Sequence, residues 1–302
     1  MSDFFNSGWS LYIAIATALS LLACLALLII AARRRVMAND NTTGHVWDED
    51  LRELNNPLPR WWMWLFVLTV VFSAVYLAFY PGLGSMPGQF GWSSVAQYQD
   101  EQAKARAATA PLYATFAATP APELARSAQA MAIGERLFAN NCATCHGADA
   151  RGSKGFPNLT DRDWLWGGTP ENIAETITHG RQGNMPPIAG AVGTSVDVRN
   201  VANYVLSLSG SPHDSIAASI GRPKFAVCAA CHGADGKGNP ALGAPNLTDR
   251  VWLHGWGEDA VVAIVTQGKS NVMPPHASRL TVEQVHVLSA YVWGLSNRAA
   301  SQ

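Results

Sequence analysis

Two uninterrupted apolar runs dominate the first third of the chain. Residues 11–32 contain no charged side chain, and residues 61–80 form a second uncharged run of 20 residues. At 1.5 Å of rise per helical residue, the first run reaches about 33 Å, enough to cross the hydrocarbon core of a bilayer. The second run carries aromatic residues at both ends, as membrane-spanning helices do: Trp61, Trp62, Trp64, Tyr76 and Tyr80. The pattern predicts two transmembrane helices, at about 11–32 and 61–80.

Basic residues indicate how these helices are oriented. The segment between the runs holds five arginines: Arg33, Arg34, Arg35, Arg52 and Arg60. No basic residue precedes the first run, and none follows the second before Lys104. The positive-inside rule therefore predicts a cytoplasmic loop, with both termini on the periplasmic side of a bacterial inner membrane. The missing basic residues before the first run, and the arginines after it, favour an uncleaved anchor over a signal peptide. The alternative, two buried helices of a soluble protein, lacks enough other chain to cover them.

The rest of the chain consists of a linker and a repeat. Residues 81–127 are rich in Gly, Pro and Ala, which predicts a short helix within a semi-rigid tether. Beyond them the motifs CxxCHGAD, PNLTDR and MPP each occur twice, 86 to 88 residues apart. The repeat predicts two homologous domains, at 128–210 and 211–297. Because alternating patterns are scarce, we expect both to be mainly helical, which makes the whole fold all-α.

The charge balance and the cysteine content exclude some classes of function. The chain has 21 Lys and Arg against 22 Asp and Glu, so no excess of positive charge is available to neutralise phosphates. This balance argues against nucleic-acid binding. Five cysteines are too few for a disulfide scaffold, and four of them form two pairs, each followed by His. Cys24 lies within the first apolar run and is interpreted as a packing residue.

The sequence Cys-x-x-Cys-His is typical of covalent haem attachment. Two thiols form thioethers with the porphyrin, and the adjacent imidazole binds the iron. The two copies are Cys142, Cys145 and His146, and Cys228, Cys231 and His232. They predict two covalently bound c-type haems. The alternatives are a zinc site, which would need further shared ligands, and a structural disulfide within each pair.

The other histidines do not supply shared ligands, because each aligns with a different residue type in the other copy: His179 with Gln267, His254 with Trp166, and His276 with Ile188. We therefore expect these three to be surface or loop residues. The candidates for the second axial ligand are Met185 and Met273, which lie 39 and 41 residues after the histidines of their own copies and begin the two Met-Pro-Pro motifs. The sequence leaves open whether each methionine serves its own copy or the other.

The PNLTDR motifs suggest further haem contacts. A metal-bound histidine usually donates its second ring N–H to an outer acceptor, and a backbone carbonyl in this loop is a candidate. Polar and aromatic side chains that follow could contact the haem propionates or could be purely structural: Arg162, Trp164, Arg250 and Trp252.

The attachment motif, PNL and the late methionine make both copies resemble class I cytochrome c domains, over residues 128–297. The resemblance implies a small helical bundle around each haem. It also implies thioethers at Cys142, Cys145, Cys228 and Cys231, proximal ligands at His146 and His232, and distal ligands at Met185 and Met273. In that family the carbonyl of the proline in PNL accepts the hydrogen bond of the proximal histidine, which corresponds to Pro157 and Pro245 here.

The N-terminal third narrows the resemblance. The stretch HVWDEDLRELNNPLPRWWMWLF resembles the dihaem subunit III of cbb3-type cytochrome c oxidase, often called CcoP or FixP. Many members of that family have one membrane span, so the additional span predicted at residues 11–32 departs from the common family pattern. The resemblance implies an electron-input subunit without an oxygen-reducing site of its own. Its expected partners are a donor cytochrome c, a monohaem cytochrome c subunit and the catalytic haem-copper subunit.

Three other functions stay open. A dihaem subunit of a periplasmic dehydrogenase would use the same motifs, and the NNPLPRWW segment speaks against it. A dihaem peroxidase needs one iron with a displaceable ligand, which the matched methionines oppose. A purely structural interaction module would carry no covalent haem.

Overall fold

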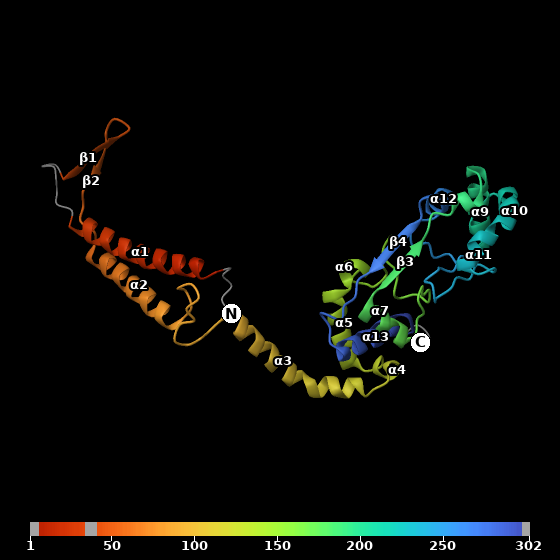
Figure 1. The fold of residues 1–302 in the computed structure, drawn as a ribbon, viewed down its shortest axis with the longest axis horizontal. Coiled ribbons are helices and arrows are strands. Elements are labelled where there is room, and N and C mark those ends of the chain that lie inside the picture. Colours follow the sequence, from red (N-terminus) through yellow and green to blue (C-terminus); the bar gives the residue numbers. More distant parts are fainter. Residues whose placement is uncertain (1–5, 34–40, 298–302) are drawn as a thin grey trace. The chain divides into compact units, whose positions relative to one another are not determined.

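The computed structural model describes residues 6–33 and 41–297. The fold is mostly helical and divides into two compact units, Met1–Ala108 and Thr109–Gln302 (Figure 1). The boundary falls inside one helix, α3 (Ser94–Ala117). Each unit is described by itself below.

The first unit contains both predicted spans as helices, α1 (Ser7–Ala32) and α2 (Arg60–Phe79). Each starts within a few residues of the predicted position. They are long and apolar enough to cross a membrane, and almost none of their apolar windows is buried, 6% for α1 and none for α2. Core helices of a soluble protein would be covered, so the exposure favours lipid as their environment. Arg33 follows α1, whereas Arg34 and Arg35 lie outside the described residues.

The segment between the spans includes a hairpin that the sequence analysis did not predict. Its strands are β1 (Thr42–Trp47) and β2 (Leu51–Leu54), with Trp47 opposite Leu51. The turn places Asp48 and Glu49 at positive φ, a conformation that Asp tolerates better than most residues. The linker also differs from prediction. Instead of a short helix it contains the 24-residue α3, which continues through Pro111.

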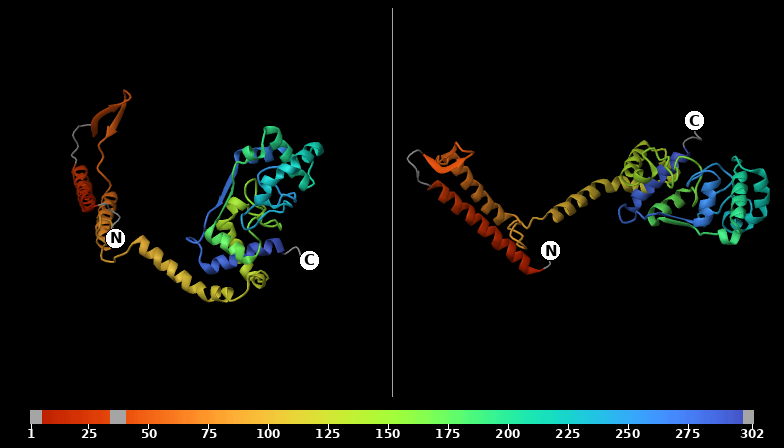
Figure 2. Two further views of the ribbon diagram at one scale, coloured as in Figure 1. Left: turned by 45° about the vertical axis from the view of Figure 1, so that its right-hand side comes forward. Right: turned by 90° about the horizontal axis from the view of Figure 1, so that it is seen from above.

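The second unit holds both repeats (Figure 2). The linker ends with the short helix α4 (Ala121–Leu124). The first repeat supplies α5 (Ala128–Asn141), α6 (Ala143–His146), α7 (Pro170–His179), β3 (Arg181–Met185), α8 (Ala189–Val192) and α9 (Ser195–Leu208). The second supplies α10 (Ser215–Gly221), the 3₁₀ helix η1 (Arg222–Phe225), α11 (Ala226–His232), α12 (Glu258–Gln267), β4 (Lys269–Met273) and α13 (Val282–Asn297). Helix predominates, as predicted, and the two short strands are an addition.

The last helix of each repeat packs against the other repeat. Helix α13 lies against α5 and α7 of the first repeat, whereas α9 lies against α10 and α12 of the second. Figure 1 shows α13 beside α5 and α7, and α9 beside α10. The crossing of α5 and α13 is close, since a Cβ on Gly134 would lie 2.6 Å from the Cβ of Tyr291. Only glycine allows the two backbones to approach this far.

The hydrophobic cores mix residues from both repeats in the same way. We call one the first-Cys cluster: Phe138, Ala150, Ile173, Ile177, Leu280, Val285, Leu288 and Val292. We call the other the second-Cys cluster: Val192, Val198, Val201, Ala202, Val205, Phe225, Cys228, Val261 and Val265. The two hydrophobic clusters contain residues from both sides of residue 210. The boundary at residue 210 therefore separates the two sequence repeats, and the division into two separate domains stays a prediction.

Strands β3 and β4 join the repeats as an antiparallel ladder. Arg181 is opposite Met273, and Met185 is opposite Lys269. Each repeat contributes one strand, so each strand completes its hydrogen bonding only with the other repeat. The ladder carries both candidate distal ligands at strand ends.

Candidate functional site

Each Cys-x-x-Cys-His motif lies on one helical turn. Cys142 ends α5 and the motif continues through α6, whereas the second motif lies within α11. Burial, and to a smaller extent the charge of Cys145, raises the pKa of Cys142 to about 11. Burial likewise raises the pKa of Cys228. Both are therefore thiols at neutral pH, and all four are free to form thioethers.

The two histidines are held in the same orientation. His146 Nδ1 is 3.0 Å from the Pro157 carbonyl oxygen, and His232 Nδ1 is 3.0 Å from that of Pro245. Because a carbonyl only accepts, Nδ1 carries the proton in both rings, which leaves a lone pair on Nε2. These are the hydrogen bonds that the resemblance implied. Burial is the main reason that the pKa of His146 is lowered, which favours the neutral imidazole that a metal needs.

The methionines pack against the cores of the opposite motifs. Met273 and Cys142 both pack against the first-Cys cluster. Met185 packs against the second-Cys cluster, of which Cys228 is a member. The first cysteine of each motif therefore shares a hydrophobic cluster with the methionine of the other repeat.

Two glycines at the starts of the strands allow this exchange. A Cβ on Gly180 would lie 2.3 Å from the Met273 carbonyl oxygen, and one on Gly268 would lie 2.8 Å from that of Met185. Both glycines have positive φ, +72° and +75°. Each Met-Pro-Pro backbone therefore runs directly over the glycine of the opposite repeat.

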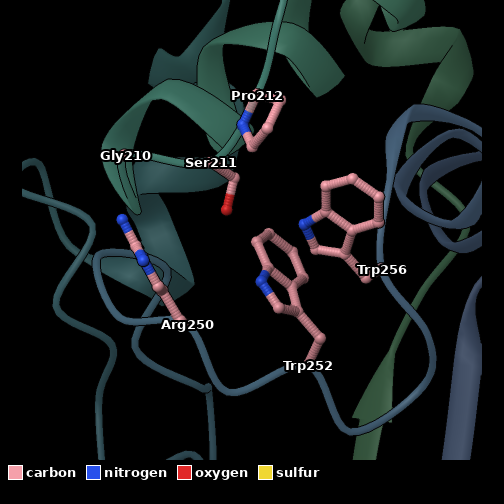
Figure 3. Close-up of a pocket in the computed structure, with 6 residues that line it drawn as sticks. All are labelled: Gly210, Ser211, Pro212, Arg250, Trp252 and Trp256. Carbon is pink, nitrogen blue, oxygen red and sulfur yellow. The ribbon is translucent and has the colours of Figure 1, made fainter.

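A cavity of about 440 Å³ is lined by Gly210, Ser211, Pro212, Arg250, Trp252 and Trp256. Figure 3 shows the two indoles next to one another, with Arg250 and Ser211 across from them. The Trp252 Nε1 atom is buried without a hydrogen-bond partner, although its ring packs against the second-Cys cluster. A buried N–H without an acceptor is costly, so this donor fits a ligand that brings one, such as a propionate.

In the first repeat, Trp164 packs against the first-Cys cluster. Arg162 and Arg250 are exposed on the surface. The structure thus brings both tryptophans to the cysteine motifs, and Arg250 to the edge of the cavity.

The three unshared histidines are not equivalent. His179 is exposed on α7, and His254 accepts a 2.7 Å hydrogen bond from Asn271. His276 lies in a loop, as expected, but its Nδ1 atom is buried without a partner. In the sequence His276 differed from its counterpart Ile188 and gave no other signal, so the burial of its Nδ1 atom was not predicted.

The residues present fit haem c. Each motif offers two thiols, an imidazole whose Nδ1 faces a backbone carbonyl, and an apolar cluster against which a methionine packs. Within residues 6–33 and 41–297, no group of three or more His, Cys, Asp or Glu is placed to hold a metal ion. The donor set at each motif is thus two thiols, one imidazole and one thioether, which corresponds to a c-type haem site.

Comparison with known families agrees with these features. Residues 39–87 match a family described as the N-terminal domain of cytochrome oxidase-cbb3, FixP. Residues 129–205 and 224–292 match one described as cytochrome c oxidase, cbb3-type, subunit III. The second match occurs twice, once over each cysteine motif.

Individual relatives cover most of the chain. A cbb3-type cytochrome c oxidase subunit CcoP of Rubrivivax gelatinosus is 66% identical over 98% of this chain and 97% of its own length. The FixP subunits of Azorhizobium caulinodans and Sinorhizobium medicae are 43% and 42% identical, over 83% and 84% of this chain and 92% and 93% of their own lengths. Sequence, fold and site therefore agree, and the chain belongs to the CcoP/FixP family of cbb3-type cytochrome c oxidase subunits.

Proposed function

We propose that this chain carries electrons through two covalently attached haems c, from a donor cytochrome c toward the oxygen-reducing haem-copper centre of another subunit. The observation that carries the proposal is the matched pair of sites, each with two thiols, a carbonyl-oriented imidazole and a thioether. Haem bound at these sites supplies one-electron chemistry at its iron. No residue of the chain needs to gain or lose a proton at the iron for that chemistry.

The ligand assignment follows the packing. Cys142 and Cys145 would hold the first haem, with His146 proximal and Met273 distal. Cys228 and Cys231 would hold the second, with His232 proximal and Met185 distal. Each haem then takes its two axial ligands from different repeats. Histidine–methionine ligation raises the reduction potential, which suits electron acceptance from a high-potential donor.

The chain's residues would tune and protect these haems. The Pro157 and Pro245 carbonyls fix the ring orientation of the proximal histidines. Buried aliphatic side chains of the two clusters would exclude water from haems held at the two motifs. The chain offers electron transfer and no oxygen-reducing centre of its own.

The membrane helices would anchor the haem-bearing unit in the inner membrane. The arginine distribution supports a cytoplasmic hairpin and a periplasmic second unit. In that topology α1 and α2 also give a helix-packing surface for the catalytic subunit, and the monohaem subunit would be the next electron acceptor.

The test is purification of the complex through a tag on this chain, after gentle solubilisation of the membranes. Haem types by pyridine haemochrome, copper content and cyanide-sensitive oxygen uptake are measured on the same sample. Haem b and copper that copurify with oxygen uptake support the proposal, with two haems c contributed by this chain. Haem c alone, in a complex shown by cross-linking to be intact, would instead support a dehydrogenase anchor.

A further inference from the structure

Two loops that leave the β3–β4 ladder are held in the same way. The Ile188 N–H donates to the Val265 carbonyl oxygen at 3.0 Å, and the His276 N–H donates to that of Ile177 at 2.9 Å. The two donors, Ile188 and His276, are 88 residues apart in the sequence, and so are the two acceptors, Ile177 and Val265. Ile188 and His276 therefore occupy equivalent positions, each three residues after the methionine of its loop.

The equivalent positions carry different chemistry. Ile188 packs against the second-Cys cluster, beside Met185. At the corresponding place near the first-Cys cluster the chain has the imidazole of His276, between the end of α7 and the buried Leu280, whose N–H donates to the His276 carbonyl oxygen at 3.0 Å. One site thus has an aliphatic side chain where the other has a potential metal ligand.

The imidazole lacks a partner in the polypeptide. Its Nδ1 atom is buried and makes no hydrogen bond, a state that costs about 1–3 kcal/mol unless another group is provided. His276 is also near enough to His146 that its charge lowers the pKa of that histidine. A group that satisfies this nitrogen must therefore accept its lone pair or a hydrogen bond from it. The iron of a haem held at His146 would be such a group, since the two histidines are near one another.

We propose that His276 is a reserve distal ligand of the first haem, which binds the iron through its neutral imidazole when the Met273 thioether is displaced. An iron–nitrogen bond forms and an iron–sulfur bond breaks, with no electron gained or lost. The ring proton stays on Nε2 while Nδ1 provides the lone pair. The second haem has no such reserve, because Ile188 cannot coordinate a metal. The inference rests on the proposed function and on the exchange of methionines.

The test compares matched variants of the full chain, purified with its complex. The single variants are Met273→Ala and Met185→Ala. The double variants are Met273→Ala/His276→Ile and Met185→Ala/Ile188→His, which interchange the two side chains at the equivalent position. Covalent haem is counted by pyridine haemochrome, spin state is measured by electron paramagnetic resonance, and carbon monoxide binding is measured on the reduced protein.

Met185→Ala should give a high-spin haem that binds carbon monoxide. Met273→Ala should stay low-spin with a bis-imidazole spectrum and bind no more carbon monoxide than the wild-type complex does, at a lower reduction potential than the wild type. The double variant Met273→Ala/His276→Ile should then behave as Met185→Ala does, and Met185→Ala/Ile188→His should regain a low-spin haem.

Two results would overturn the inference while the proposed function stands. One is a Met273→Ala variant that becomes high-spin and binds carbon monoxide as Met185→Ala does. The other is a Met273→Ala/His276→Ile variant that stays low-spin, since another group would then be the ligand. A wild-type chain without covalent haem would overturn the proposed function, and this inference with it.

Discussion

Met185 and Met273 lie at opposite ends of one antiparallel ladder, because Met185 is opposite Lys269 and Met273 is opposite Arg181. The two ends of the ladder are four residue steps apart along a strand, or about 14 Å. The same two strands therefore set the positions of both candidate distal ligands. A change in strand register would displace both thioethers at once.

The exchange of methionines can be tested one haem at a time. In a Cys142→Ala/Cys145→Ala background only the second haem is attached. There Met185→Ala should remove the Met-to-iron charge-transfer band and lower the reduction potential, whereas Met273→Ala should leave both unchanged. The reciprocal background, Cys228→Ala/Cys231→Ala, should give the reverse result. If each methionine instead affects the haem of its own repeat, the exchange is wrong.

Loss of the first cysteine pair should also weaken the fold. Cys142→Ala/Cys145→Ala should lower the number of covalent haems in this chain from two to one. It should also lower the unfolding temperature, because the first-Cys cluster would lose its packing against the first haem. Circular dichroism during heating and haem counts on the same samples measure this. A Cys24→Ala variant is the control. A haem count that stays at two would contradict the attachment.

Gly180→Ala should disturb the first haem through the backbone. The added Cβ would meet the Met273 carbonyl oxygen at 2.3 Å, and the residue would be strained at φ +72°. We expect a destabilisation of about 1–3 kcal/mol and a weaker Met-to-iron band. Gly183→Ala is the matched control, since it lies in the same strand and its Cβ would meet nothing within 4 Å. Equal effects from both variants would show that strand propensity, rather than the contact, is responsible.

A carboxylate cluster between the repeats makes stability depend on pH. Burial, and then the charges of Asp249 and Asp161, raise the pKa of Asp163 to about 6. A carboxyl with a raised pKa favours folding in its protonated form. Its contribution is therefore complete at low pH and lost as pH rises through about 6.

Asp163→Asn should accordingly stabilise the protein at pH 7.5, by an amount on the order of 1 kcal/mol after screening by solvent. The advantage should vanish below about pH 4. Urea unfolding of the purified chain at several pH values measures it, and Glu135→Gln, an exposed change on α5, is the control. An advantage that does not change with pH would rule out the carboxylate explanation.

Trp252→Phe tests whether the cavity lined by Trp252 and Arg250 accommodates a haem propionate. Loss of the buried N–H removes a donor that would neutralise part of a propionate's charge, so the reduction potential of the second haem should fall while its Met-to-iron band remains. Trp256→Phe, which changes an exposed indole of the same cavity, should have little effect. A potentiometric titration decides between these outcomes.

The sequence predicted α1, α2 and the cysteine motifs because these depend on local pattern: an uncharged run, or a fixed spacing within one turn. It did not predict the exchange. The last helices of the two repeats carry similar apolar faces, so either could cover either first helix. The connection from Leu208 to Ser215 is short, which keeps α9 next to α10 and so favours the observed arrangement. The β1–β2 hairpin was missed because its exposed strands carry no alternating burial pattern.

The exchanged helices impose an order on biosynthesis. In the proposed periplasmic topology, Cys142 and Cys145 would be exported before Met273 and α13, yet both of these later segments pack into or against the first-Cys cluster. The second-Cys cluster is built on α9, which would already have been exported when Cys228 follows. The earlier motif would thus be enclosed last, and in that topology it would stay accessible for haem attachment for longer than the later one.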